Sequence, residues 1–206
     1  MYVPEHFREA DLARLDWLAL HDAFGTLVSA VDGAPFASHL PVLYRREDRR
    51  VTVTGHWARP NPQWCAIEGQ RVLFIFHGPH TYISPRWYHE ARQHVPTWNY
   101  AAAHLYGKIR LLEDPAALER IVTALADKYE SGPDAWSVSG ADPKILTMLR
   151  GIVGFELAVD EVQLKFKLNQ NHPRGNLEGA IHGLEAVPGD DARTVMNLMQ
   201  HTLDPK

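Results

Sequence analysis

The sequence predicts an α+β fold in which an antiparallel β-barrel is decorated by helices. Four consecutive segments between residues 25 and 77 are rich in β-branched and aromatic residues, and turn residues separate them. Two later segments, residues 97–112 and 155–168, are long enough for strands, and the second alternates apolar and polar residues. Helical patterns are few, which disfavours the regular strand–helix alternation of a doubly wound parallel sheet.

Hairpin turns are expected between the first strands. Asp32-Gly33 and Glu47-Asp48 are residue pairs of the kind that connect adjacent antiparallel strands. They divide this part of the chain into short strands that pair as neighbours. The predicted strands are residues 25–31, 36–44, 50–54 and 71–77.

Helix starts are marked by a polar capping residue followed by proline. Asn61-Pro62, Asp114-Pro115 and Asp142-Pro143 have this form, and the second opens the clearest helix of the chain. Apolar spacing also predicts a short N-terminal helix around residues 12–18 and two C-terminal helices from about residue 174.

The length, without a Pro/Gly/Ser-rich linker, predicts a single domain over residues 1–206, and the use of one cysteine is typical of the reducing cytoplasm. Subtracting 25 acidic from 21 basic residues gives a net charge of −4, so no general attraction to nucleic acid or to an anionic membrane is expected. Cys65 is the only cysteine and excludes an intrachain disulfide. The densest apolar run, Val72 to Phe76, is far shorter than the roughly 20 residues of a membrane helix, and the N-terminus lacks the features of a signal peptide.

Several enzyme classes are excluded by missing motifs. The chain has no G-x-G-x-x-G after a strand, no P-loop, no G-x-S-x-G and no H-E-x-x-H. The 12 histidines include His77, His80, His89 and His94, but no carboxylate or third histidine stands at ligand spacing. We therefore expect no metal site.

Four clusters combine tryptophan, tyrosine, histidine, asparagine and proline at the predicted strand ends. A flat heterocyclic ligand with polar edges requires this mixture where loops converge. Taken singly, each tryptophan is better explained as a half-buried core residue, so only the combination carries weight. The clusters are residues 38–42, 55–62, 77–85 and 95–100.

These clusters and two later motifs resemble one known family, the PaiB-type proteins, known as FMN-binding negative transcriptional regulators. The motifs are S-H-L-P, G-H-x-A-R-x-N-P, G-P-H-x-Y-I-S-P-x-W-Y, V-P-T-W-N-Y-x-x-x-H-x-Y-G, I-V-G-F-E and K-x-K-L-x-Q-N. They lie at residues 38–41, 55–62, 78–88, 95–107, 152–156 and 165–171. The resemblance implies the split β-barrel of flavin reductases and pyridoxamine-phosphate oxidases, and a homodimer that holds FMN at the subunit interface.

Arg59 is the leading candidate for the FMN phosphate. It follows a predicted strand and precedes the helix start at Asn61, so a guanidinium and a positive helix end converge there. The oxidase branch of the fold often has a second basic residue where this chain has Pro60. The alternative is a solvated arginine in a structural turn, and replacing Arg59 by Ala is expected to weaken FMN binding but not riboflavin binding.

The flavin ring edge requires hydrogen-bond donors and acceptors. Ser38 and His39 are adjacent on a strand and face opposite sides, so only one side chain can reach the ligand. Lys167 at the end of the last long strand would favour an anionic reduced flavin, unless it serves only as a charged strand edge. The predicted cofactor-binding residues are Ser38, His39, Thr54, Gly55, His56, Arg59, Asn61, Trp98, Asn99, Lys167, Gln170 and Asn171.

Three functions remain open at this point. The first is an FMN-binding protein of the PaiB type that acts as a negative regulator, with direct DNA binding doubtful because no helix-turn-helix or basic helix is visible. The second is a flavin-dependent oxidoreductase for an unidentified small molecule. The third is a haem-binding split barrel that uses a histidine such as His80 or His182.

Overall fold

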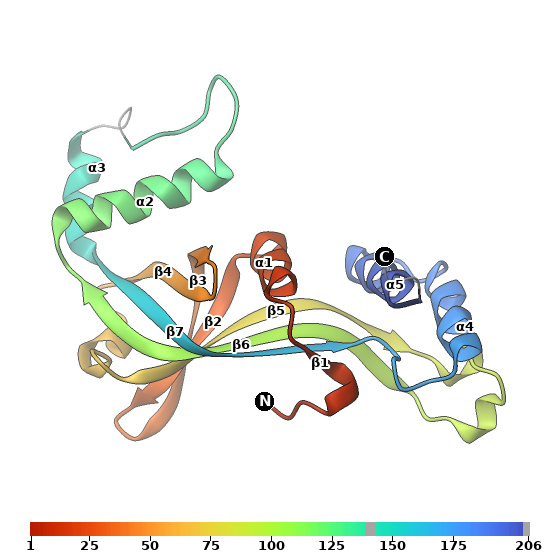
Figure 1. Cartoon of the computed structure of the whole chain (residues 1–206). Helices are drawn as coiled ribbons and strands as arrows, with labels where there is room; N and C mark the ends of the chain where they lie inside the picture. The colour runs from red at the N-terminus through yellow and green to blue at the C-terminus, as the bar shows by residue number, and fades with distance from the viewer. Residues whose placement is uncertain (139–142, 204–206) are drawn as a thin grey trace. The chain divides into compact units, whose positions relative to one another are not determined.

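A closed antiparallel sheet organises the structure. The computed structural model describes residues 1–138 and 143–203. Its seven strands follow the order β1-β7-β4-β3-β2-β5-β6, and β7 also pairs with β6 (Figure 1). Because β6 and β7 pair, the order from β7 to β6 returns to its start, as in a barrel. The predicted α+β class with an antiparallel barrel is confirmed.

The strand predicted at residues 97–112 has these bounds in the structure, and the four strands predicted between residues 25 and 77 extend beyond their predicted ranges. The strand bounds are β1 (Arg8–Glu9), β2 (Phe24–Val31), β3 (Ala34–Glu47), β4 (Arg50–Ala58), β5 (Arg71–Ile83), β6 (Thr97–Leu112) and β7 (Ile152–Lys167). The helices are η1 (Glu5–Phe7), α1 (Leu12–His21), η2 (Pro62–Ala66), η3 (Pro85–Trp87), η4 (Ala91–Gln93), α2 (Pro115–Tyr129), α3 (Pro143–Met148), η5 (Leu149–Gly151), α4 (Arg174–Leu184) and α5 (Asp190–Leu203).

The chain divides into two compact units. Unit 1 comprises residues 1–18, 77–103 and 163–206, and unit 2 comprises residues 19–76 and 104–162. Strands β5, β6 and β7 each contribute residues to both units. The prediction of a single domain over the whole chain stays a prediction.

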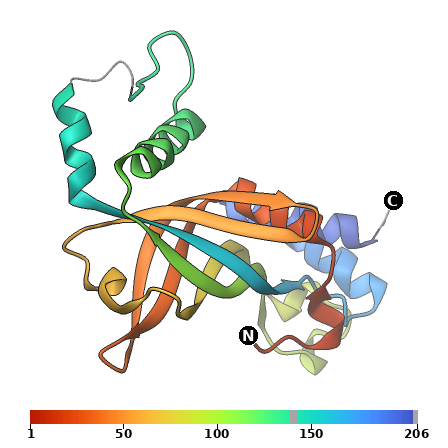
Figure 2. The same ribbon diagram turned by 60° about the vertical axis from the view of Figure 1, so that its left-hand side comes forward.

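Two hairpins form the centre of unit 2. The turn at Asp32-Gly33 is confirmed, with positive φ angles of 51° and 78°. The second turn lies one residue later than predicted, because Glu47 still pairs with Arg50 and leaves Asp48 and Arg49 as the turn. Figure 2 shows these hairpins in orange, with α2 beside them.

Continued strand pairing explains why β4 is longer than predicted. His56, Trp57 and Ala58 pair with residues 154, 153 and 152 of β7, so β4 continues to Ala58 instead of ending at residue 54. Trp57 packs in the core against Phe155, with ring centroids 4.6 Å apart. Likewise β5 continues to Ile83, so residues 77–83 form a strand and not the predicted loop.

Two of the three predicted helix caps are confirmed, and both lie in unit 2. The Asn61 side chain accepts a hydrogen bond from the Gln63 backbone N–H at the start of η2. Asp114 accepts one from the Ala117 backbone N–H at the start of α2. Asp142 of the third motif lies outside the described residues. The two caps fix where the chain leaves the sheet.

In unit 1, the C-terminal helices α4 and α5 pack against each other (Figure 1). Their facing apolar residues include Leu184, Val195 and Met199, which are buried. A Cβ atom at Gly183 would lie 2.2 Å from the Trp87 ring, so only glycine allows η3 to pack this closely against α4. No helix among the described residues is long and apolar enough to cross a membrane.

Candidate functional site

A cleft in unit 2 combines cationic and apolar walls. It has a volume of about 760 Å³ and lies between α2 and a face of the sheet. We name it the arginine cleft because four arginines line it, Arg45, Arg50, Arg110 and Arg120. Its volume lies within the roughly 300–1,000 Å³ of typical small-molecule sites.

Strand register defines the floor of the arginine cleft. Thr54 pairs with Leu43 on one side and with Glu156 on the other, so these three residues form a row across β3, β4 and β7. All three line the cleft. Gly154, two residues before Glu156, allows α2 to pack closely, since a Cβ there would lie 2.9 Å from the Ile121 side chain. The floor thus combines a hydroxyl, a carboxylate and an apolar side chain.

The arginines of the cleft differ in their partners. Arg45 pairs with Glu47 at 2.5 Å, and Arg110 pairs with Glu156 at 2.9 Å. In the described part of the chain, Arg50 and Arg120 form no ion pair. Two cations on separate elements, β4 and α2, are therefore available to an anionic ligand.

Apolar side chains also line the arginine cleft. Leu43, Leu112 and Ile121 line it beside the arginines. An apolar wall next to unpaired cations suits a ligand that carries a flat ring at one end and an anion at the other. Three carboxylates also line the cleft, and each has a partner: Glu47 pairs with Arg45, Glu156 pairs with Arg110, and Asp114 caps α2. With these carboxylates engaged, the two unpaired arginines and the volume are compatible with FMN.

His56 lies on the same face of β4 as Thr54. It pairs with Gly154, and its Nδ1 is buried without a hydrogen-bond partner. Burial lowers the pKa of His56 below its ordinary value of 6.5. The imidazole is therefore held neutral, with a ring nitrogen left unsatisfied.

Ser38, Asn61 and Gln63 form a separate hydrogen-bonded region, which we name the η2 corner. The Asn61 Nδ2 donates to the Ser38 Oγ at 2.9 Å. Gln63 is 1% exposed; its Oε1 accepts from the Trp57 Nε1 at 3.1 Å. Its Nε2 also has acceptors within 3.2 Å on three residues, Leu27, Ser29 and Phe36. The polar groups of this corner are engaged with one another.

Arg59 is also engaged by the protein. Its Nε donates to the Arg150 carbonyl at 2.9 Å, and its NH2 nitrogen donates to the Ile152 carbonyl at 3.1 Å. Its NH1 nitrogen pairs with Glu113 at 3.1 Å, and the guanidinium lies 5.4 Å from the Trp64 ring centroid. Three of its five N–H groups are thus used to join the end of β4 to the start of β7 and to Glu113.

The remaining predicted residues of unit 2 have different surroundings. His39 is exposed; its Nδ1 lies 3.0 Å from the Thr26 Oγ1, and its ring stacks with that of Phe24. A Cβ at Gly55 would lie 2.9 Å from the Phe155 ring, so Gly55 serves core packing. Thr54 is therefore the predicted residue that lines the arginine cleft.

Two predicted residues of unit 1 lie on β6 with opposite exposure. Trp98 is 53% exposed and its ring lies near those of His80 and Tyr82. Asn99 is fully buried; its Nδ2 contacts the Met199 Sδ of α5 at 3.3 Å, and its Oδ1 has no partner. Strand alternation separates these neighbours.

Lys167 and Asn171 line a second cleft, in unit 1, with a volume of about 290 Å³. We name it the lysine cleft. Gln170 does not line it; its side chain bonds the Leu168 backbone N–H and the Phe166 carbonyl. Gln170 thus closes the turn that follows β7.

The two candidate haem ligands are exposed histidines. His80 lies 3.3 Å from a carboxylate oxygen of Asp191, and its side chain is 61% exposed. His182 lies 3.0 Å from Glu185 and is 86% exposed. Their surroundings differ from the sheltered apolar pocket that an axial haem ligand occupies.

Comparison with known proteins assigns the family. The family described as "Putative FMN-binding domain" matches residues 1–161, and the chain is 37% identical to "Protease synthase and sporulation protein PAI 2" of Bacillus subtilis (strain 168) over 98% of both chains. The chain belongs to the PaiB-type FMN-binding family. FMN is the cofactor that this family implies.

Solved structures support the split-barrel fold of this PaiB-type chain. The flavocytochrome Anf3 from Azotobacter vinelandii matches with a TM-score of 0.62 and 15% identity, over 80% of this chain and 72% of that one. The FAD and heme binding protein from Mycobacterium smegmatis matches with a TM-score of 0.57 and 19% identity, over 78% and 73%. At such identities the likeness concerns the fold alone.

Proposed function

We propose that this PaiB-type chain binds FMN in the arginine cleft, with the phosphate on Arg50 and Arg120 and the ring against Leu43, Leu112 and Ile121. The observation that carries this proposal is the pair of unpaired arginines beside an apolar wall. Charge-assisted hydrogen bonds from guanidinium groups are the strong contacts available to a phosphate. Bound FMN would supply redox chemistry, which the side chains of this cleft do not.

The protein's own groups would orient the flavin. The Thr54 hydroxyl lies on the floor of the cleft and can donate to or accept from a polar ring edge. His56, on the same face, keeps an unsatisfied Nδ1 that can serve as donor or acceptor. In this role Thr54 and His56 position the flavin ring through hydrogen bonds, and neither acts as a general acid or base.

We further propose that negative regulation, the role implied by the PaiB resemblance, is exerted without specific contact with duplex DNA. The net charge of −4 opposes binding to DNA. Two of the four arginines of the β3–β4 hairpin are paired within it, Arg45 with Glu47 and Arg46 with the Asp48 carbonyl. Retention of one promoter fragment over competitor DNA at physiological salt would contradict this.

A homodimer is part of the same proposal. The exposed Phe24 and its stacked neighbour His39 present an aromatic surface on β2 and β3, which is more favourable at an interface than in water. Light scattering at micromolar concentration should give twice the 23.3 kDa mass of one chain. The mass of one chain would contradict the dimer.

Flavin titration tests the cofactor site. Apoprotein should bind FMN more tightly than riboflavin, which lacks the phosphate, as measured by quenching of flavin fluorescence. Arg50→Ala should weaken FMN binding by about tenfold or more, the value of one charge-assisted contact. Arg49→Ala is the matched control, because Arg49 is an exposed neighbour of Arg50 on the same hairpin and does not line the cleft.

The FMN affinities of these variants show whether the phosphate binds in the arginine cleft. Equal FMN affinity in the wild type, Arg50→Ala and Arg49→Ala would remove the phosphate from the arginine cleft. An absorption spectrum of the purified protein adds an independent readout, since flavin bands and a Soret band are distinct. A Soret band without flavin bands would support haem binding instead.

A further inference from the structure

The lysine cleft of unit 1 is lined almost entirely by polar side chains. They come from the segment before β6 and its first residue, from the end of β7 and from the turn that follows it. Val95 is the one apolar residue among the described residues that line it, and no carboxylate does. A cleft that is lined by a lysine and by no carboxylate favours negative ligands over positive ones. Its polar lining includes His94, Thr97, Lys167, Asn169, Asn171 and His172.

Lys167 is a half-buried cation without a carboxylate partner in the described part of the chain. Its Nζ donates to the Thr97 Oγ1. Burial, and then the charge of Lys165, lower the pKa of Lys167 below its ordinary value. A half-buried cation without an opposite charge loses part of its hydration, and a bound anion would offset that cost.

Lys165 shows the contrasting arrangement two residues earlier on β7. Its Nζ donates to the Tyr2 carbonyl at 3.1 Å and lies within 5.7 Å of the ring centroids of Tyr2 and Tyr100. These contacts compensate its charge within the protein. Lys167 has fewer such contacts: its Nζ donates to the Thr97 hydroxyl and lies 5.9 Å from the Phe7 ring centroid, and it lines a cleft that is open to a ligand.

Hydrogen bonding fixes the tautomer of His94. Asn176 accepts a hydrogen bond from the His89 backbone N–H at 2.9 Å through its Oδ1, so its Nδ2 is a donor. This Nδ2 lies 3.3 Å from the His94 Nε2, which must accept. Neutral His94 consequently carries its proton on Nδ1, an N–H group that can donate to an anion.

His172 completes an aromatic cluster with His94 and Tyr88. The His94 and His172 ring centroids are 5.4 Å apart, and that of Tyr88 lies 5.1 Å and 4.9 Å from them. The Asn169 Nδ2 donates to the Tyr88 Oη at 2.8 Å, and the His172 backbone N–H donates to the Asn169 carbonyl at 2.9 Å. The turn after β7 is thereby fixed, and His172 is held in the cleft.

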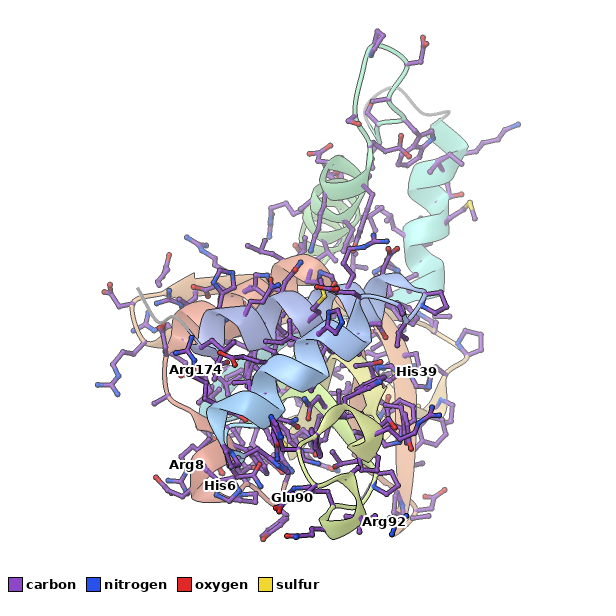
Figure 3. All side chains as sticks on the ribbon, turned by 90° about the vertical axis from the view of Figure 1, so that its right-hand side faces the viewer. His6, Arg8, His39, Glu90, Arg92 and Arg174 are labelled. Atoms are coloured by element: carbon purple, nitrogen blue, oxygen red, sulfur yellow. The ribbon has the colours of Figure 1, made fainter. Side chains whose placement is uncertain are left out.

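Figure 3 shows the elements that bear this region: Glu90 and Arg92 label the segment before β6, and Arg174 labels the start of α4. Arg174 pairs with Glu178 of its own helix at 2.7 Å. The cation of α4 nearest in sequence to the turn is therefore neutralised locally. Among the described residues that line the cleft, Lys167 is the one lysine or arginine.

We propose that the lysine cleft is an oxyanion site that binds the phosphate or carboxylate of a small molecule through Lys167, His94 and His172. The ligand is small, since the volume is about 290 Å³. The amides of Asn169 and Asn171 line the same cleft as additional polar partners. This inference does not rest on the position of FMN, because all of its residues belong to unit 1 and the arginine cleft belongs to unit 2.

Titration with inorganic phosphate and, separately, with acetate tests the site in the full-length protein. Histidine ring signals in NMR spectra report the event, and those of His94 and His172 should shift with saturation. Lys167→Gln should weaken the binding of the effective anion by about tenfold or more, since a charge-assisted contact is lost. The stronger of the two anions identifies the ligand as phosphate-bearing or carboxylate-bearing.

Lys108→Gln is the matched control, because it removes one lysine charge from an exposed position on β6 outside the lysine cleft. It should leave anion binding unchanged. No shift of His94 and His172 in the wild type with either anion would overturn the proposal. So would equal weakening by Lys167→Gln and Lys108→Gln, which would indicate nonspecific attraction.

The same NMR signals can be followed during titration with FMN and, separately, with riboflavin. If FMN shifts His94 and His172 and riboflavin does not, the oxyanion site is supported and its ligand is the flavin phosphate. That result would overturn the placement of the phosphate on Arg50 and Arg120. If FMN binds without shifting either histidine while phosphate shifts both, the two sites are separate and both proposals are supported.

Discussion

Unit 2 holds arginines in two settings, Arg59 beside the η2 corner and Arg50 and Arg120 in the arginine cleft, and the surroundings engage them differently. Arg59, beside the corner, donates hydrogen bonds to two backbone carbonyls and to Glu113. Arg50 and Arg120 form no ion pair among the described residues. Arg59 is thus occupied in joining chain segments, whereas the guanidinium groups of Arg50 and Arg120 remain available to the proposed FMN phosphate.

The largest loss of stability is expected when the hydrogen bonds of Gln63 in the η2 corner are removed. Gln63→Leu should lower the free energy of unfolding by about 3 kcal/mol or more, since several buried polar groups lose their partner at a cost of roughly 1–3 kcal/mol each. These groups include the Trp57 Nε1 and the Leu27 and Phe36 carbonyls. Urea unfolding measures the change. Gln200→Leu, at an exposed position of α5, is the control and should change stability little.

A smaller loss is expected at Arg59. Arg59→Ala should destabilise the protein by about 1–2 kcal/mol, a value reduced because the side chain is partly exposed. It should affect FMN and riboflavin equally, since the residue joins chain segments. Thermal unfolding and paired flavin titrations check both parts. A loss confined to FMN would support Arg59 as the phosphate ligand that the sequence predicts.

The smallest expected effect is on the pH dependence of stability, through His56. Burial lowers its folded pKa below 6.5, so the unfolded chain binds the proton more readily. The stability contribution of neutral His56 is therefore fully present above the unfolded pKa of about 6.5 and declines as pH falls toward the folded value. His56→Asn should reduce the dependence of unfolding free energy on pH between about 5 and 7. An unchanged pH dependence would show that His56 does not contribute.

Much of the fold could be predicted because local patterns determine it. The turn at Asp32-Gly33 and the caps at Asn61 and Asp114 depend on a few neighbouring residues, and the structure confirms them. The extension of β4 to Ala58 depends on pairing with β7, almost a hundred residues away in sequence, and was missed for that reason. Pairing between distant strands leaves no local signal.

The candidate site was less predictable. Thr54, Lys167 and Asn171 are among the predicted residues, and all three line clefts. The sequence does not single out Arg50 and Arg120 of the proposed phosphate site, because Arg50 resembles a solvated hairpin residue and Arg120 carries no local signal on its helix. The amide Asn99, predicted to contact the cofactor, is buried with Met199 of α5, a contact that only the tertiary structure reveals.

The central claim is that the arginine cleft, and not the region of Arg59, holds the FMN phosphate. The most direct test is the ratio of riboflavin to FMN dissociation constants in the wild type, in Arg50→Ala/Arg120→Ala and in Arg59→Ala. Loss of two charge-assisted contacts should lower this ratio by about a hundredfold in the double variant, while riboflavin affinity and the ratio in Arg59→Ala stay near the wild-type values. A ratio that falls in Arg59→Ala and not in the double variant would contradict the claim.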